Sequence, residues 1–246
     1  MQINPKEIKK QFEKNMNTYD EHACVQKLMA QILVEKIAEI NSNFENILEL
    51  GSGTGLLTRE IAKKINFKNY LANDIIAKSE NYIKKIIPNS TFYLGNAQKI
   101  KPSKKVDLII SNAMFQWFEN LDTICERCKN NLTTNGLLAF TTFSPNNFKE
   151  IKSLTGLSLD YKTIDELKSV FEKDFEIIYT EQFEEKLEFA NPLEILAHLK
   201  KTGVNSLTHW SFKEVKDFCE KYLKAYSNIT LTYSPIIFIC KKKGGV

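Results

Sequence analysis

A short apolar stretch that runs directly into a glycine-rich turn constrains the fold more than any other feature of the sequence. Ile47–Leu50 has the length of a buried strand, Gly51–Gly55 reads Gly-Ser-Gly-Thr-Gly, and helical spacing of apolar residues resumes at Leu56. Such a turn lets the backbone approach a ligand closely, while the N-terminus of the next helix offers free N–H groups. The segment therefore predicts a strand, a ligand-binding turn and a helix.

The spacing of these glycines distinguishes between known nucleotide-binding turns. The dinucleotide pattern needs a glycine where Leu56 stands, and no Gly-Lys-Ser or Gly-Lys-Thr follows that would make a P-loop. What remains is an acidic strand end, Glu49, before the turn, and Asp74 at the end of the next strand. A carboxylate at that second position can hold both hydroxyls of a ribose.

Strand and helix patterns alternate through the following segment. Helices are predicted at 77–87 and 120–132, between strands at Tyr70–Ile75, Thr91–Leu94, Val106–Asn112 and Leu137–Phe143. Parallel neighbouring strands need long crossovers, so this alternation favours an α/β fold. We expect a mostly parallel sheet with helices on both of its faces.

Helical patterns flank this alternating segment on both sides. Apolar spacing predicts helices at 5–16 and about 21–40 before the first strand. Further helix starts are predicted by two capping boxes and by a cap followed by proline: Thr163 with Glu166, Ser211 with Glu214, and Asn191-Pro192 with Glu194.

Two late strands, at about 175–189 and 230–240, are predicted to close the sheet as antiparallel neighbours. We expect a single domain over residues 1–246. Its N-terminal helical cover would span 1–44, and a helical insertion on the substrate side would span 190–225, before the last strand.

The charge balance argues against a nucleic-acid partner. Lysine and arginine number 34 against 30 acidic residues, and Arg59 and Arg127 are the only arginines. Nucleic-acid binding usually needs a basic stripe, and bidentate recognition of phosphates or bases favours arginine. No stretch approaches 18 apolar residues, so no membrane span is predicted. We expect a monomer with neither a nucleic-acid nor a membrane partner.

The five cysteines are an odd number without a disulfide-framework spacing, and the N-terminus lacks the apolar run of a signal peptide. A reducing cytoplasm is therefore the expected compartment. Cys125 and Cys128 form a CxxC pair, but no second pair or nearby histidine completes a metal set. We interpret the pair as structural and predict no metal.

The pattern Glu49, Gly51–Gly55 and Asp74 resembles the class I methyltransferases that use S-adenosylmethionine, over about residues 45–145. The resemblance implies a Rossmann-like, mostly parallel seven-stranded sheet and S-adenosylmethionine as the cofactor. Asn96 stands where that family usually carries an acidic residue near the adenine. The implied cofactor-binding residues are Tyr19, His22, Glu49, Gly51, Gly53, Asp74, Ile75, Asn96, Ala97, Gln98 and Asn112.

Segments outside this core resemble a narrower family, the malonyl-[acyl-carrier protein] O-methyltransferases of biotin synthesis. They are Phe12 with 19–23 and Gln26, then 111–117, 141–145 and 198–205. The family methylates the free carboxylate of a malonyl thioester. The resemblance implies catalytic roles for Tyr19, Gln116, Trp117 and His198, and the acidic carrier could meet Lys200, Lys201, Lys213 and Lys216.

The implied chemistry fits the sequence, because a carboxylate is already ionised at neutral pH and needs no general base. Catalysis then reduces to placing two opposite charges that vanish together in the transition state. Three alternatives stay open: an O-methyltransferase of a free polycarboxylate, a C-methyltransferase of a quinone precursor, and a non-catalytic protein that binds S-adenosylmethionine.

Overall fold

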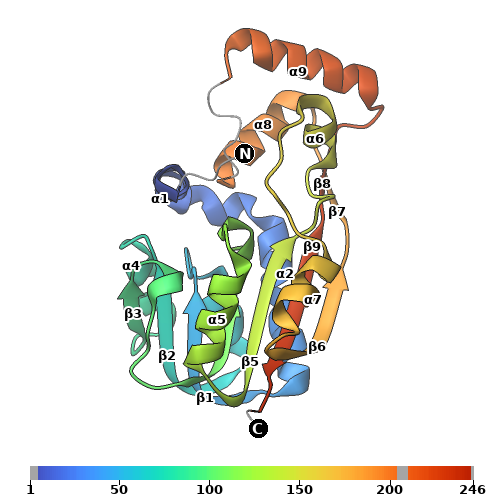
Figure 1. Cartoon of the computed structure of the whole chain (residues 1–246). Helices are drawn as coiled ribbons and strands as arrows, with labels where there is room; N and C mark the ends of the chain where they lie inside the picture. The colour runs from blue at the N-terminus through green and yellow to red at the C-terminus, as the bar shows by residue number, and fades with distance from the viewer. Residues whose placement is uncertain (1–4, 204–209, 245–246) are drawn as a thin grey trace.

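The computed structural model describes residues 5–203 and 210–244 and centres on a seven-stranded sheet (Figure 1). The strand order is β3-β2-β1-β4-β5-β9-β6. Their bounds are β1 Asn43–Leu50, β2 Asn66–Asp74, β3 Thr91–Leu94, β4 Val106–Ser111, β5 Leu132–Phe143, β6 Phe175–Gln182 and β9 Pro235–Lys242.

The first five strands pair in parallel, and β9 runs antiparallel to both β5 and β6. In the register, Leu50 lies beside Ser111 and Asn73, so the ends of three central strands meet at one edge of the sheet. This arrangement confirms the predicted class I methyltransferase fold with a mostly parallel seven-stranded sheet.

Helices cover both faces of the sheet, as the alternation predicts. On one face, α2 (Cys24–Ile40), α3 (Leu56–Lys64) and α4 (Ser79–Ile86) pack on alternate residues of the strands, such as Ile47 and Leu108. On the other face, α5 (Leu121–Asn131) and α7 (Ile164–Phe171) bury their apolar sides against residues such as Leu138 and Phe238. Both layers exclude water from the sheet, which is the main stabilising contribution to such a core.

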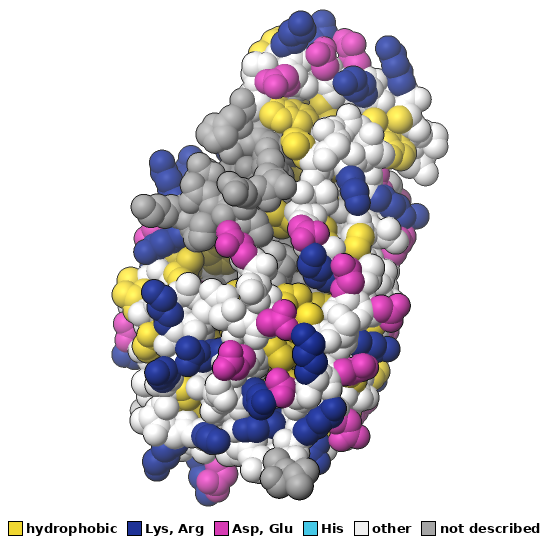
Figure 2. All heavy atoms as spheres, in the orientation of Figure 1, with side chains coloured by type: hydrophobic (Ala, Val, Ile, Leu, Met, Phe, Trp, Pro, Cys, Tyr) yellow, Lys and Arg dark blue, Asp and Glu magenta, His cyan; other side chains and the backbone are white. Residues whose placement is uncertain are grey.

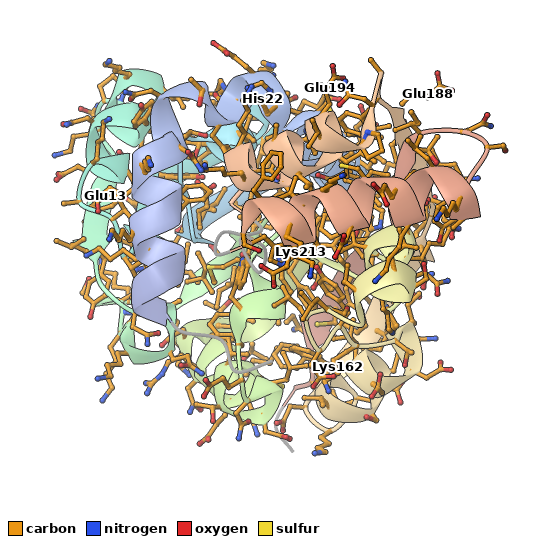
Figure 3. All side chains as sticks on the ribbon, turned by 90° about the horizontal axis from the view of Figure 1, so that it is seen from above. Glu13, His22, Lys162, Glu188, Glu194 and Lys213 are labelled. Carbon is orange, nitrogen blue, oxygen red and sulfur yellow. The ribbon has the colours of Figure 1, made fainter. Side chains whose placement is uncertain are left out.

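A second layer of structure lies over the carboxyl ends of the parallel strands, at the top of Figure 1. We call it the cap, and it consists of α6 (Lys149–Thr155), α8 (Pro192–Lys201), α9 (Phe212–Ala225) and the two-stranded sheet of β7 (Glu185–Glu188) and β8 (Thr230–Tyr233). These elements share an apolar cluster that includes Ile195, Phe218 and Tyr222. Seen from above, α1 (Pro5–His22) lies beside α8 and α9 (Figure 3).

The predicted helix starts are confirmed. Thr163 and Ser211 are N-caps of complete capping boxes, and the side chain of Asn191 accepts a hydrogen bond from the N–H of Glu194. Residues 204–209 of the predicted insertion, including Val204 and Asn205 of the 198–205 segment, lie outside the described residues.

Two predictions about element boundaries are wrong. The predicted strands 175–189 and 230–240 are each divided in two, because their outer parts leave the main sheet and pair with each other as β7 and β8 in the cap. The predicted gap between helices at 17–20 is also absent. α1 continues to His22 and α2 starts at Cys24, because Met16 and Tyr19 are buried and extend the apolar side of the first helix.

Candidate functional site

The glycine turn after β1 has a backbone conformation that residues other than glycine rarely adopt. Gly51 and Gly53 have φ values of 69° and 53°. A Cβ atom on Gly51 would lie 2.2 Å from Sδ of Met114, and one on Gly53 would lie 3.3 Å from Cζ of Phe12. The turn therefore needs glycine for its backbone conformation and for the close approach of its neighbours.

Asp74 fastens the glycine turn to the end of β2. Its Oδ2 accepts a hydrogen bond from the N–H of Gly53 at 2.8 Å, and its Oδ1 accepts one from the N–H of Ile76 at 2.9 Å. Burial raises the pKa of the Asp74 carboxyl, while these two N–H donors act in the opposite direction. The carboxylate is thus fixed in place at the edge of the turn.

Glu49 is the second carboxyl group of the site, and it is buried at the end of β1. It accepts a hydrogen bond from Oγ1 of Thr58 at 2.6 Å and another from the phenol of Tyr70. Burial raises the pKa of Glu49 to about 7, although both hydrogen bonds favour the ionised form. The group therefore changes its charge near neutral pH.

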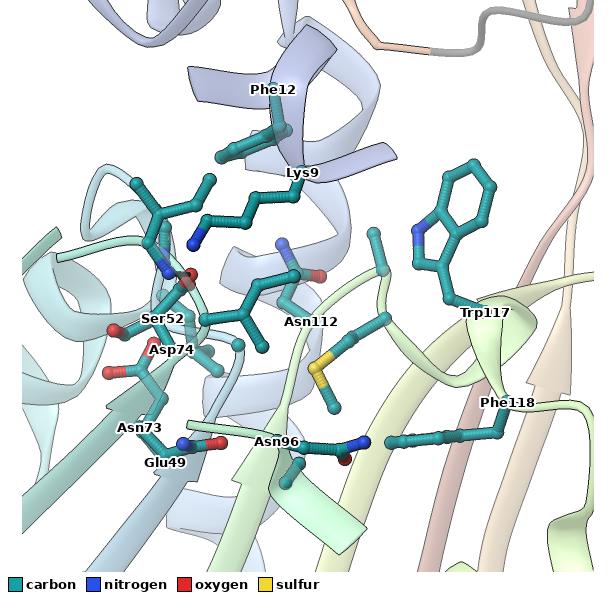
Figure 4. A pocket seen from close by; sticks show the side chains of 18 of the residues that line it. Lys9, Phe12, Glu49, Ser52, Asn73, Asp74, Asn96, Asn112, Trp117 and Phe118 are labelled. Carbon is teal, nitrogen blue, oxygen red and sulfur yellow. Dashed lines mark hydrogen bonds between the residues drawn. The ribbon is translucent and has the colours of Figure 1, made fainter. Parts of the chain in front are cut away.

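A cavity of about 370 Å³ opens beside these carboxyl groups, at the carboxyl ends of the strands. Open α/β sheets commonly bind ligands in this position. Glu49, Ser52 and Asp74 gather on one side of it, and Trp117 and Phe118 stand on the other (Figure 4). The cavity therefore has a polar end at the glycine turn and an aromatic wall after β4.

α1 forms the roof of the cavity, with Lys9 and Phe12 among the lining residues. Its position is fixed from outside by Asp20, which accepts a hydrogen bond from Oγ1 of Thr54 at 2.5 Å and pairs with the guanidinium of Arg59. One of the two arginines of the chain thus joins the N-terminal helix to the glycine turn.

Most of the predicted site residues line this cavity. They are Tyr19, Glu49, Gly51, Gly53, Asp74, Ile75, Asn96, Ala97, Gln98, Asn112 and Trp117. They come from α1, from the ends of β1 and β2, from the segments after β3 and β4 and from η2 (Phe115–Trp117). Asn96 also caps η1 (Ala97–Lys99), because its Oδ1 accepts a hydrogen bond from the N–H of Gln98 at 2.8 Å.

Three predicted residues, His22, Gln116 and His198, are not among the residues that line the cavity. Gln116 instead donates from Nε2 to the carbonyl oxygen of Ala113 at 2.7 Å. His198 is buried in the cap, where its Nε2 lies 2.7 Å from the phenol oxygen of Tyr233. Burial lowers the pKa of His198 to about 4, so the ring is neutral at pH 7. These three side chains therefore lie outside the lining of this cavity.

Several lining residues were not predicted as site residues: Lys9, Ser52, Thr54, Leu56, Leu57, Asn73, Ile76, Ala113, Met114, Phe118, Glu119 and Asn120. Ser52 lies within the glycine turn, and 118–120 directly follow the Gln-Trp pair, so their positions in the sequence could have indicated them. Lys9 stands one helical turn before Phe12, which was a weaker signal.

The residues present fit the S-adenosylmethionine that the sequence pattern implies. Ser52 Oγ is buried in the cavity wall, and it has no hydrogen-bond partner among the described residues. An unpaired buried hydroxyl is costly, so it is suited to bind a polar ligand group. The Asp74 carboxylate lines the same end of the cavity, and a carboxylate after the second strand can accept hydrogen bonds from ribose hydroxyls.

Metal binding finds no support in the part of the chain described here. Within residues 5–203 and 210–244, no three His, Cys, Asp or Glu side chains are grouped to hold a metal ion. Cys125 and Cys128 lie on the buried side of α5, and burial raises the pKa of both thiols, that of Cys125 to about 12. Nor is any helix in these ranges long and apolar enough to cross a membrane.

Comparison with known proteins gives the family. A model described as a methyltransferase domain matches residues 48–140. The malonyl-[acyl-carrier protein] O-methyltransferase of Haemophilus influenzae is 34% identical over 247 residues, which cover 97% of this chain and 95% of that protein. The enzyme of the same name from Calditerrivibrio nitroreducens is 36% identical over 95% of this chain and 96% of its own length. The chain belongs to the malonyl-[acyl-carrier protein] O-methyltransferase family.

Membership of this family makes the chain an S-adenosylmethionine-dependent methyltransferase. Solved structures agree at the level of the fold. The YcgJ protein from Bacillus subtilis matches with a TM-score of 0.63 and 13% identity, over 87% of this chain and 99% of that one. The N-methyltransferase NodS from Bradyrhizobium japonicum, solved with S-adenosyl-L-homocysteine, matches with a TM-score of 0.61 and 8% identity, over 96% and 98%.

Proposed function

We propose that the chain methylates the free carboxylate of malonyl-[acyl-carrier protein] to its methyl ester, an early step of biotin synthesis. The observation that carries this proposal is the similarity over nearly the whole chain to enzymes with that name. The similarity includes α1 and the cap, which lie outside the residues 48–140 that match the general methyltransferase model. It therefore favours this acceptor over a free polycarboxylate or a quinone.

The roles of the residues follow from the chemistry of the two substrates. S-adenosylmethionine supplies a methyl group on a sulfonium centre. Ser52 and Glu49 would hold its amino-acid part, Asp74 would accept from its ribose, and Asn96–Gln98 would line its adenine. Tyr19 and Trp117 would contact the acceptor. Burial and the charge of Asp20 raise the pKa of the Tyr19 phenol, which therefore stays protonated and can donate a hydrogen bond.

A general base is not required by this assignment. The acceptor carboxylate is ionised at neutral pH, with a reference pKa near 4. His198, the predicted residue most able to act as a base, is not in the cavity wall. We therefore assign it a structural part in the cap. The chain's contribution to rate would then be placement of the acceptor and exclusion of water around it.

For the carrier protein, we propose contact with the lysines at the end of α8 and on α9. Lys200, Lys201, Lys213 and Lys216 are exposed, and Lys213 is labelled in Figure 3. Charges of both signs are interspersed over the face in Figure 2, so this face as a whole has no strong positive potential. The attraction for an acidic carrier protein would therefore come from these four lysines. Charge reversal of Lys200 and Lys201 should raise the KM for the carrier and leave cofactor affinity unchanged, because exposed charges mainly affect encounter.

The same proposal includes the organisation of the chain and its place in the cell. We propose one methyltransferase domain over 1–246, with the cover at 1–44 and the insertion at 190–225, acting as a monomer in the cytoplasm. All five cysteines fall within the described residues and are free, which supports a reducing compartment.

The test is transfer of a labelled methyl group from S-adenosylmethionine to a panel of acceptors. Malonyl-carrier protein should be the best acceptor, malonyl-CoA a weaker one, and free malonate nearly inactive. Acetyl-carrier protein is the matched control, because it presents the same protein without a free carboxylate. A tricarboxylate or a quinone precursor as the best acceptor would replace the proposal with the corresponding alternative, and binding without turnover of any acceptor would indicate a non-catalytic protein.

A further inference from the structure

Ala113 has a backbone conformation that its residue type does not favour. Its φ is 51°, and it is one of three non-glycine residues with positive φ in the described ranges. It follows the end of β4 after one intervening residue, Asn112, and lines the cavity. A left-handed backbone at a residue with a Cβ atom costs free energy and persists only where its surroundings enforce it. Something in the structure must therefore hold Ala113 in place.

Two side chains from different elements satisfy both backbone groups of Ala113. Its N–H donates to Oγ1 of Thr141 on β5 at 2.8 Å, and its carbonyl oxygen accepts from Nε2 of Gln116 at 2.7 Å. The Thr141 hydroxyl, which is fully buried, donates onward to Oδ1 of Asn112 at 2.6 Å. We call Thr141 and Gln116 the Ala113 brace.

The brace is itself connected to the two neighbouring layers of the fold. Asn112 donates from Nδ2 to the carbonyl oxygen of Gln26 on α2 at 3.0 Å. Oγ1 of Thr142 donates to Oε1 of Gln116 at a longer distance, 3.4 Å. The turn after β4 is thus hydrogen-bonded to α2 on one side and to β5 on the other, and these bonds restrict its backbone conformation.

The conformation of Ala113 decides where the next residues enter the cavity. Met114 lies against the glycine turn, so closely that a Cβ atom on Gly51 would lie 2.2 Å from its Sδ. Trp117 forms the opposite wall (Figure 4). A rotation of the backbone at Ala113 would move both side chains, and with them the width of the space between the polar end and the aromatic wall.

We propose that Thr141 and Gln116 are positioning residues of the methyl-transfer site, which act by holding Ala113 at positive φ. They set the place of Trp117 and Met114, and so the place of the acceptor relative to the methyl group. The expected effect on kcat rests on the proposed function, whereas the expected effect on the position of Trp117 and Met114 does not. In-line displacement is sensitive to such placement, and a displacement of about 1 Å can lower a rate roughly 100-fold.

The experiment compares Thr141→Val, which keeps the side-chain shape and removes the hydroxyl, with Thr141→Ser, which keeps the hydroxyl. Thr141→Val should lower kcat roughly 10- to 100-fold. Its Kd for S-adenosylhomocysteine should change by less than about threefold. Thr141→Ser should retain most of the activity. Should Thr141→Val fail to fold, Gln116→Met removes the other arm of the brace and carries the same expectation.

A second readout does not depend on the acceptor. The chain has two tryptophans, so a Trp210→Phe background leaves Trp117 as the sole tryptophan, whose emission can be excited selectively. Thr141→Val should increase quenching of Trp117 by acrylamide, and Thr141→Ser should not. Adding Ala113→Gly to Thr141→Val should restore part of the wild-type value in both readouts, because glycine adopts positive φ without a brace.

The outcomes separate the two claims. If the wild type fails to methylate malonyl-carrier protein, the proposed function is wrong, while fluorescence still tests the brace. The positioning role would be overturned by any of three results. These are unchanged quenching in Thr141→Val, equal effects of Thr141→Val and Thr141→Ser, and a loss in Thr141→Val that is confined to cofactor affinity.

Discussion

The sheet and the cap of this molecule both have apolar cores, but they differ in the polar contacts that accompany those cores. The sheet is stabilised by two apolar layers and regular ladders, with fully buried residues such as Leu48 and Ile109 at its centre. The cap has a smaller apolar cluster of its own, and buried polar contacts between distant segments add to it. Buried Glu150 on α6 accepts from the N–H of Thr232 at 3.0 Å, and His198 on α8 bonds to Tyr233.

This difference suggests a division of labour. The regular pairing of β1, β2 and β4 fixes the edge of the sheet where the cofactor site lies. The polar contacts of the cap can be removed by substitution without changing that edge. Substitutions in the sheet edge should therefore act on cofactor binding, and substitutions in the cap should act on local stability.

The largest effect is expected from Gly53→Val. Its φ of 53° is unsuited to a β-branched residue, and the side chain would enter the space between the turn and Phe12. Affinity for S-adenosylhomocysteine should fall roughly 100-fold or more in calorimetry. Gly156→Val is the matched control, since its φ is 70° but nothing lies within 4 Å of its Cβ position. Equal loss of affinity in both variants would show that backbone strain, not ligand exclusion, is responsible.

Asp74→Ala should give the next largest effect on the same readout. It removes an acceptor for the ribose and also frees the N–H groups of Gly53 and Ile76. We expect a loss of about 1.5–3 kcal/mol in binding free energy, typical of a charge-assisted hydrogen bond. Unchanged affinity in a folded Asp74→Ala protein would refute the ribose assignment.

In the cap, Glu150→Ala should act on stability and leave cofactor affinity intact. It leaves the buried N–H and hydroxyl of Thr232 without their acceptor, at a cost of about 2 kcal/mol. Hydrogen exchange should accelerate in α6 and β8 but not in β1 or β4. Glu184→Ala removes only the exposed pair with Lys149 and should cost less than about 1 kcal/mol. Uniform acceleration across the whole chain would mean that cap and sheet unfold as one unit.

At neutral pH the smallest effect should come from the charge of His198, because this group acts on stability only as the pH falls. Its folded-state pKa of about 4 lies below the ordinary value of 6.5, so the unfolded chain takes up the proton first as the pH falls. The wild type should therefore lose about 2–3 kcal/mol more stability than His198→Gln between pH 7.5 and pH 4, and nothing extra above pH 7.5. Denaturant titrations at several pH values measure this, and parallel curves for the two proteins would contradict it.

The same contrast explains which features could be predicted from the sequence. Residues 43–143 were predicted well because apolar periodicity and a glycine turn are local signals, and the role of Asp74 follows from its place at the end of β2. The division of 175–189 into β6 and β7 was missed, because a continuous strand pattern does not show that its two parts pair with different strands. β6 pairs with β9 and β7 pairs with β8, and Ser234 separates these two partners. The family resemblance implies a catalytic role for His198, whereas its pairing with Tyr233, 35 residues away, leaves no local signal in the sequence.

Gln116 shows that a segment can be predicted correctly while the contacts of one of its side chains are not. The Gln-Trp pair was predicted to line the site, and Trp117 does so. The neighbouring Gln116 turns its amide to Ala113 instead, because a residue at positive φ needs partners that the sequence pattern does not reveal.

The most direct test of the central claim is the chemical bond that holds the transferred methyl group. Malonyl-carrier protein would be incubated with the enzyme and labelled S-adenosylmethionine, and the isolated carrier treated with mild alkali. The account predicts release of the label as methanol, because a methyl ester on the malonyl carboxylate is hydrolysed. Label that stays on the carrier through this treatment, or that never reaches it, would contradict carboxyl methylation as the function of this chain.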